Sequence, residues 1–170
     1  MSQGPFSQVI QVVDVPPAGL HLVLSPDAAI REALAREAGI IAVPALTARL
    51  HVAPEGAAGL RVTGTVEGVV RQTCGVTLEP FDAPLSEPVD VHFVPAGTLK
   101  PPVEGEEDTG IDPPDEIVDG GIDLGALASE FLNLGIDPYP RKPGAVFEQP
   151  DAGEGNLSPF AALSRLNRDE

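Results

Sequence analysis

The sequence predicts an α+β fold, with a mainly antiparallel sheet of five to seven strands, two main helices and a short C-terminal helix. Several segments alternate apolar and polar residues with period two, which is typical of half-buried strands. Two segments repeat apolar residues at helical spacing behind a residue that suits an N-cap. The short connections between strands favour hairpins over parallel crossovers. The pattern does not distinguish an open sheet from a barrel-like one.

The length of 170 residues predicts one domain with tails. With six Phe, one Tyr and no Trp, its core is expected to consist of Val, Leu, Ala and Ile. The 19 Pro and 18 Gly residues indicate long irregular segments. We expect a β-rich core with one helix (1–95), an acidic flexible loop (96–114), a helical segment packing on the core (115–141), a flexible linker (142–157) and a short C-terminal helix or tail (158–170).

Two short strands and a helix are expected before residue 40. The stretch "PFSQVIQVVDV" indicates an opening strand that ends at two prolines, and "LHLVLS" indicates a second strand. In "SPDAAIREALAREAG", Ser25 suits the N-cap and Pro26 suits the first helical position. Gly39 suits the position after the C-cap. These signals predict a helix over about 26–38.

A hairpin of longer strands follows. "LTARLHV" indicates a strand, "APEGAAG" a turn, and the residues after it a long strand. In the long strand, even-numbered positions from Leu60 to Val70 are apolar or glycine, so this face is expected to be buried. Gly64 and Gly68 fall on that face, where they permit close packing or a bulge. The next strand, "APLSEPVDVHFVP", places His92 on the solvent face.

The second half begins with an acidic stretch. Residues 100–123 carry nine acidic side chains and, after Lys100, no basic one, which predicts a solvated loop over the first part. "DEIVDGG" then indicates a short strand or turn. "IDLGALASEFLNLGI" predicts a second helix over about 123–134, with Asp123 as its N-cap and Gly135 as its stop. The apolar face of this helix is expected to hold Leu124, Leu127, Ala128, Phe131 and Leu134.

The last predicted element is "SPFAALSRLNRDE". Ser158 and Pro159 suit an N-cap and a first helical position, and Phe160, Leu163 and Leu166 follow at helical spacing. A helix this short is marginal alone, so we expect it to form fully only when it docks on another surface.

The formal net charge of −16 limits the classes of partner. Nucleic-acid binding draws on Lys and Arg contacts to phosphates, so direct RNA binding without a partner and DNA binding are both disfavoured. A basic protein partner is electrostatically favoured, although simple solubility explains the charge equally well. A single cysteine, no visible signal peptide and no long apolar run predict a cytoplasmic protein without a membrane segment.

Cys74 is the first residue to test for chemistry. A nucleophilic cysteine needs a base within reach, but strand register points Cys74 to the apolar face and His92 to solvent. A zinc site commonly begins with Cys-x-x-Cys, and Arg71 stands where the first cysteine would be. The carboxylates at 112–119 lack the spacing of a calcium loop, and no phosphate-binding motif follows the glycines. We therefore predict a buried structural cysteine and no catalytic residue, metal or cofactor.

Three blocks of sequence, in order, match one pattern: "VRQTCGVTLEPF" at 70–81, "DEIVDGGIDLGALASEFLNLGIDPYPR" at 115–141 and "SPFAALSRL" at 158–166. Together they resemble the YceD-like family, a bacterial and plastid group linked to accumulation of the 23S ribosomal RNA of the large subunit. The resemblance extends from about residue 60 to the end and implies a role in ribosome biogenesis, with no established enzymatic activity. Many members carry Cys-x-x-Cys before the Leu-Glu-Pro element, and Arg71 departs from that pattern.

The resemblance and the charge together predict a non-enzymatic ribosome-biogenesis factor. It would support 23S rRNA accumulation by binding a basic ribosomal protein or assembly factor. A Cys-dependent redox sensor and a small-ligand-binding protein are the alternatives. The candidate partner contacts are Glu130, Asp123, Tyr139 and Arg141. The residues of the family motif expected to be structural are Cys74, Leu78, Glu79 and Pro80.

Overall fold

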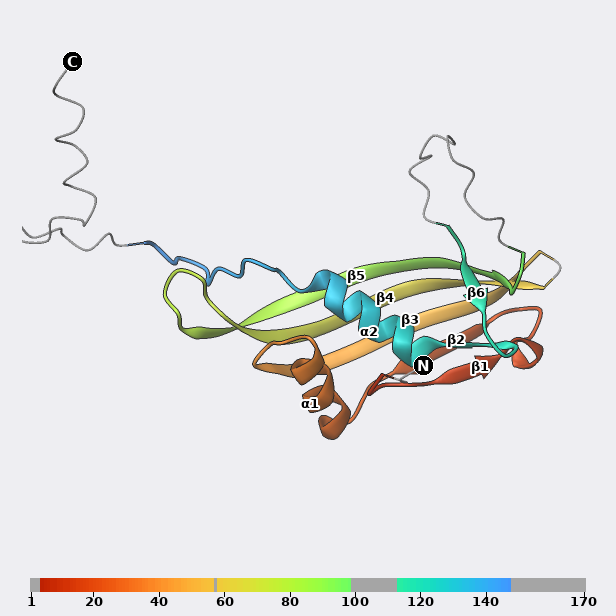
Figure 1. Ribbon diagram of the computed structural model, residues 1–170, viewed down its shortest axis with the longest axis horizontal. Helices are drawn as coiled ribbons and strands as arrows, with labels where there is room; N and C mark the ends of the chain where they lie inside the picture. The colour runs from red at the N-terminus through yellow and green to blue at the C-terminus, as the bar shows by residue number, and fades with distance from the viewer. Residues whose placement is uncertain (1–3, 57, 99–112, 148–170) are drawn as a thin grey trace, which may run out of the picture.

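The computed structural model describes residues 4–56, 58–98 and 113–147. Its main feature is a five-stranded sheet in the order β2-β3-β4-β5-β6, in which only β5 and β6 run parallel (Figure 1). These strands are β2 (Leu20–Leu24), β3 (Ala42–Glu55), β4 (Gly59–Thr73), β5 (Pro80–Pro95) and β6 (Asp115–Ile117). Because β2 and β6 are the edges, the sheet is open and not a closed barrel. The predicted α+β class is confirmed.

A second sheet contains only two strands. In it, β1 (Val9–Gln11) pairs antiparallel with β7 (Gly121–Asp123). The opening strand is much shorter than the sequence pattern predicts, because β7 offers only three residues for pairing. At Val12, whose N–H donates to the carbonyl of Gly120 over 2.9 Å, the chain turns into the 3-10 helix η1 (Val12–Asp14).

The predicted alternation along β4 is confirmed. Leu60, Val62, Val66 and Val70 are all buried, and the opposite, outer face of the sheet carries mainly Thr and Arg. A Cβ atom at Gly68 would lie 2.7 Å from the carbonyl oxygen of Ala45 on β3. The glycines of β4 therefore permit close approach, whereas the register shift between β3 and β4 lies at another place, between Ala42 and Ala45.

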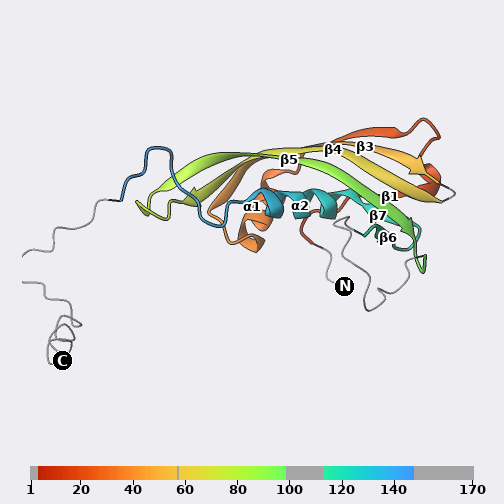
Figure 2. The same cartoon turned by 90° about the horizontal axis from the view of Figure 1, so that it is seen from above.

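Both helices cover one face of the five-stranded sheet. Figure 2 shows α1 (Ala28–Glu37) and α2 (Leu124–Gly135) beneath the arched sheet, so neither of these helices covers its outer face. The core between these layers consists of aliphatic residues with two phenylalanines, Phe6 and Phe93. Its side chains with no more than 2% exposure include Val52, Leu60, Val62, Val66, Val70, Leu124 and Leu132.

The start of α1 differs from the sequence prediction. Asp27, not Ser25, is the N-cap, because its carboxylate Oδ1 accepts the N–H of Ile30 over 2.9 Å. Pro26 lies before the cap and is buried there. The end of the helix agrees with the prediction: Gly39 has a φ of +68° and follows the C-cap.

The buried face of α2 is rotated from the predicted face. Leu134 is 72% exposed, whereas Leu132 is fully buried. The backbone of residues 6–8 packs directly against Gly125. The face of α2 that contains Gly125 is therefore buried, and Leu132 is buried as well. Gly135 is helical and faces β5, where a Cβ atom would lie 2.7 Å from the Leu85 side chain. Close packing, and not a left-handed stop, therefore explains this glycine.

Several predicted segments lie wholly or partly outside the described residues. They are the acidic loop at 96–114, the linker at 142–157 and the helix at 158–170. Neither α1 nor α2, the two α-helices of the described part, is long and apolar enough to cross a membrane.

Candidate functional site

The chain turns around Cys74 where β4 passes into β5. The backbone N–H of Cys74 donates to the carbonyl of Glu79 over 2.9 Å, and the N–H of Leu78 donates to the carbonyl of Cys74 over the same distance. The Cys74 Sγ accepts the backbone N–H groups of Val76 and Thr77, each over 3.4 Å. The thiol therefore organises its own loop at the end of the hairpin.

Residues 136–147 follow α2, and the part of this segment from Asp137 to Lys142 packs against the loop. The Gln72 amide donates to the carbonyl of Asp137 over 2.8 Å, and the Gly75 N–H donates to the carbonyl of Pro140 over 2.8 Å. Lys142 donates its backbone N–H to Cys74 Sγ over 3.4 Å. We call the loop at 74–79 together with residues 136–147 the hairpin end. It unites segments more than sixty residues apart, and Cys74 lies at its centre.

Hydrogen bonds favour the ionised form of the Cys74 thiol. Bonding from the Thr77 side chain and N–H contributes most, and the N–H groups of Lys142 and Val76 add to it. Together they outweigh burial and lower the Cys74 pKa from 9.0 to about 6. A thiolate must nevertheless be accessible in order to react. The side chain is fully enclosed, and His92 lies opposite Arg61, about 40 Å along the strand from the loop.

We expect native Cys74 to react slowly with a thiol reagent in spite of its lowered pKa. Because the side chain is enclosed, labelling must await an opening of the hairpin end. At pH 8, labelling of the native protein with Ellman's reagent should be at least about a hundredfold slower than labelling in concentrated urea. Equal rates in the two conditions, or fast native labelling at neutral pH, would favour the Cys-dependent alternative.

Arg71 does not contact the thiol. Its guanidinium lies on the outer face and forms two bonds with Asp82, at 2.6 and 2.9 Å. Asp82 raises the pKa of Arg71, and Arg71 lowers the pKa of Asp82. In residues 4–56, 58–98 and 113–147, no group of three or more His, Cys, Asp or Glu side chains is placed to hold a metal ion.

The hairpin end displays several apolar side chains. Leu78 is 76% exposed and has a φ of +60°, a left-handed conformation that costs a non-glycine residue about 1–2 kcal/mol. Tyr139 is 82% exposed, and its backbone N–H is fixed by the Asp137 carboxylate over 2.8 Å. Val146 and Phe147 are also exposed. An ordered backbone therefore holds large apolar groups in water, a feature typical of contact surfaces.

The predicted partner contacts separate into two regions. Tyr139 and Arg141 lie at the hairpin end with Cys74, Leu78 and Glu79, and Pro80 follows as the first residue of β5. Asp123 is the N-cap of α2, and Glu130 lies within that helix. Glu79 pairs with Lys142 over 3.0 Å. Leu78, expected to be a structural residue, proves to be an exposed one. The exposure of Leu78 follows from its positive φ, which the sequence pattern does not show. Its position in a tight turn was the only available signal.

Asp123 is held by the fold itself. Its carboxylate accepts the Ser7 hydroxyl over 2.6 Å and the N–H groups of Gln8, Gly125 and Ala126 over 2.7–3.1 Å. Burial opposes its ionisation, but these four bonds prevail and lower its pKa. The predicted N-cap is thus confirmed, and Asp123 also ties the N-terminal segment to α2. Its use as a partner contact stays a prediction.

Glu130 forms an acidic pair with Asp115 of β6. Burial raises the pKa of Glu130 most, and the negative charge of Asp115 raises it further. Within the described part of the chain, neither carboxylate has a basic side chain at ion-pairing distance. The contribution of Asp115 was missed in the sequence, because the two residues approach only when β6 pairs with β5.

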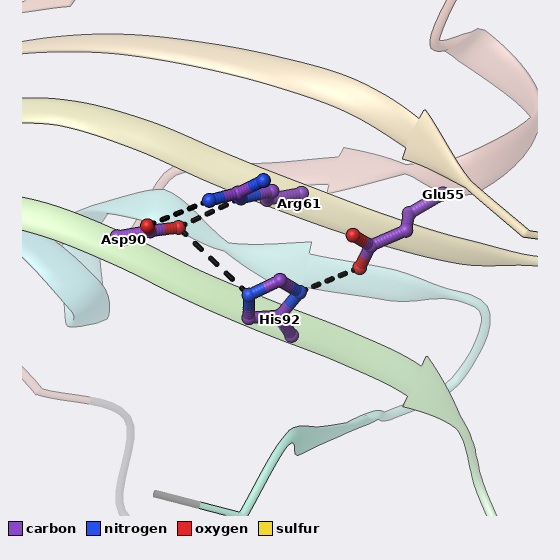
Figure 3. A network of polar contacts seen from close by, with 4 residues as sticks. All are labelled: Glu55, Arg61, Asp90 and His92. Carbon is purple, nitrogen blue, oxygen red and sulfur yellow. Dashed lines mark hydrogen bonds and ion pairs between the residues drawn. The ribbon is translucent and has the colours of Figure 1, made fainter. Parts of the chain in front are cut away.

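A polar network lies at the opposite end of the outer face (Figure 3). Arg61 binds Asp90 through two bonds of 2.7 and 2.8 Å, and His92 Nδ1 lies 2.7 Å from a carboxylate oxygen of Glu55. The side chains are 42–53% exposed, so each pair contributes little to stability. The hydrogen bonds with Asp90, followed by the negative charge of Asp90, raise the pKa of Arg61. The sequence analysis did not find this network. The strand register, which places Arg61 opposite His92, is what brings these residues together.

These features define an α+β protein with exposed apolar side chains near an enclosed cysteine. A family model described as "Large ribosomal RNA subunit accumulation protein YceD" matches residues 62–166, which is more than half of the chain. The chain therefore belongs to the YceD family, as the three sequence blocks predicted. The family is named for the accumulation of a ribosomal RNA and not for a reaction. No curated protein and no solved structure gives a significant match to the chain.

Proposed function

We propose that this protein is a non-enzymatic ribosome-biogenesis factor that supports 23S rRNA accumulation by binding a basic ribosomal protein or assembly factor. The observation that carries the proposal is membership of a family named for accumulation of the large-subunit RNA. The chemistry of the surface supports a protein partner over naked RNA, as the next two observations explain.

Acidic side chains neutralise part of the basic surface. Of the seven Lys and Arg residues in the described part of the chain, four form ion pairs with carboxylates and are less available to phosphate groups; they are Arg49, Arg61, Arg71 and Lys142. With a formal net charge of −16, the protein therefore attracts a basic partner and repels free RNA.

Asp115 and Glu130 offer a specific place for a cation. The negative charge of Asp115 makes ionisation of Glu130 less favourable, so a partner lysine or arginine between the two carboxylates would relieve the repulsion and gain attraction from both. Tyr139 and Leu78 offer the apolar contacts that commonly anchor an interface. The proposed contact surface therefore includes the acidic pair, where Asp115 lies opposite Phe93 of β5, and the apolar groups at the hairpin end, where β5 begins.

Capture of partners from cell lysate on the full chain tests this proposal. We expect a basic ribosomal protein or assembly factor to be recovered. The double variant Asp115→Asn/Glu130→Gln should recover it at least about tenfold less well, a loss of about 1.4 kcal/mol that suits two interfacial charges. The same variant should lower 23S rRNA in cells that depend on it.

The double variant Asp14→Asn/Glu37→Gln is the matched control. It removes the same charge from two exposed carboxylates on η1 and α1 and should retain capture. Equal losses in both variants would show that only net charge matters. Recovery of naked rRNA alone, with salt-sensitive binding by the purified protein, would contradict a protein partner.

A further inference from the structure

The two sides of the five-stranded sheet differ in how they could pair with another chain. From Pro80 to His92, β5 pairs with β4 on one side and, among the described residues, with no strand on the other, because β6 pairs only with the end of β5. Proline recurs there at every fourth position, as Pro80, Pro84 and Pro88. A proline has no N–H to donate to an added strand, so this part of β5 is protected against pairing with another chain.

The opposite edge, β2, has no such protection. Among the described strands β2 pairs with β3 alone, and β1, which precedes it in the chain, belongs to the second sheet. The strand reads Leu-His-Leu-Val-Leu and contains no proline. Of the five strands of the described sheet, it is the only one without a Lys, Arg, Asp or Glu residue. An apolar, uncharged edge strand readily pairs with a further strand.

One row of residues across the sheet shows where the backbone of β2 points. Pro88 cannot donate to β4, so its backbone faces the free side of β5, and the backbone of Thr65 opposite it faces β3. Arg49 of β3 lies opposite Thr65, and its carbonyl oxygen points toward β4, where a Cβ atom on Gly64 would overlap it. Val23 lies opposite Arg49 in turn, so its N–H and C=O point away from β3 and toward the free edge.

We propose that β2 pairs antiparallel with β2 of a second copy of this chain, about a two-fold axis at Leu22. Because leucine stands at both ends and at the centre of the strand, this register places Leu20 opposite Leu24 of the other copy and His21 opposite Val23. The backbones of His21 and Val23 face the same way, since the two residues lie two positions apart. Each copy therefore supplies the donors and acceptors that the free edge of the other copy needs.

The side chains of β2 also fit a second copy. Leu20, Leu22 and Leu24 are half-buried on the inner face, so pairing extends the apolar layer of one copy into the other. Val23 is 66% exposed on the outer face, and pairing would cover it beside His21. A basic segment of another protein would find no carboxylate in β2. The chemistry of this edge therefore matches the same strand of a second copy better than a charged partner.

The charge of the protein makes the association weak and dependent on salt. Two copies that each carry a formal net charge of −16 repel one another. Salt screens this repulsion, so added salt should strengthen the dimer, whereas it should weaken binding of a basic partner. The acidic pair proposed above as a partner contact lies beside β6, at the other edge of the sheet, so the dimer leaves it free.

A single new cysteine in the full chain tests the register. In the proposed dimer the Cα atoms of the two Leu22 residues lie about 4.5 Å apart, whereas those of the two Leu24 residues lie about 14 Å apart. Leu22→Cys should therefore form an intermolecular disulfide at least about tenfold faster than Leu24→Cys, the matched control on the same face of β2. Native Cys74 is retained in both variants because it is fully buried. Equal rates would overturn the proposal.

Sedimentation equilibrium of the full chain tests the pairing itself. The unmodified protein should show a monomer–dimer equilibrium, and Val23→Pro should weaken the dimer at least about tenfold. Because the lost N–H faces the free edge, unfolding of this variant in urea should change little. Val23→Thr keeps the N–H and should still dimerise. A monomer at every concentration, or the same loss in both variants, would overturn the proposal.

Capture of partners from lysate separates this proposal from the proposed function. Val23→Pro should leave the capture of a basic partner unchanged, because that contact lies at the other edge of the sheet. Loss of capture by Val23→Pro in a chain that is monomeric would place a strand of another protein on β2 and would overturn the proposed dimer.

Discussion

Replacement of Gly64 with alanine is expected to destabilise the fold by about 3–5 kcal/mol. Gly64 lies in the middle of β4 and pairs with Leu50 of β3 and Val89 of β5. A Cβ atom there would overlap the carbonyl oxygen of Arg49. Backbone cannot rotate away as a flexible side chain can, so β3 and β4 would have to separate.

The backbone conformation adds to this cost. Gly64 has a φ of +153°, which residues with a side chain rarely adopt. Relief of the overlap would disturb the ladder between the two strands that carry Leu50, Val62 and Val66 into the core. Since a domain is stable by only about 5–15 kcal/mol, one methyl group here removes a large fraction of the total.

Urea unfolding of the alanine variant is the measurement. For a chain of this size, the loss corresponds to a fall in Tm of roughly 10 °C. Gly75→Ala is the control, because a Cβ atom at Gly75 would make an ordinary contact, 3.6 Å from the carbonyl of Pro140. A variant at Gly64 that is as stable as the one at Gly75 would contradict the proposed close approach.

The pattern of β4 shows what the sequence could predict. Alternation depends only on which side of a strand faces the core, so Leu60, Val62 and Val66 were placed correctly. The same rule put Cys74 in the core, which is confirmed by its full burial. The sequence left two possible roles for Gly64, close packing or a bulge. Only the pairing register of β3 and β4 distinguishes them, because the register shift lies elsewhere, between Ala42 and Ala45.

The hairpin end shows what the sequence could not predict. Backbone groups of residues 137–142 take part in the contacts with the loop at 74–79, as in the bond from Gly75 to Pro140, and backbone groups carry no sequence signal. The acidic pair of Asp115 and Glu130 likewise depends on a tertiary contact. The burial of Leu134 was predicted wrongly. Helical periodicity identifies an apolar face of α2, but it does not show which residues at the edges of that face are covered by other elements.

Replacement of Asp123 with alanine is the second change expected to have a large effect, about 3 kcal/mol. Loss of a helix N-cap costs about 1 kcal/mol. The bonds from Ser7 and Gln8 add a further loss, because they join the N-terminal segment to α2 and end on a charged acceptor. Asp27→Ala is the matched control: its carboxylate caps α1 through a single N–H and should cost about 1 kcal/mol.

The pH dependence of stability separates charge from capping at Asp123. The folded-state pKa lies below the ordinary value of 3.8, so the ionised group stabilises the fold above that value. This contribution disappears as the pH falls through the folded-state pKa. Asp123→Asn keeps a capping oxygen but no charge, so its deficit in urea unfolding should be present at pH 7 and shrink below about pH 4. A deficit that is unchanged at pH 3 would show that geometry alone, and not the charge, makes Asp123 stabilising.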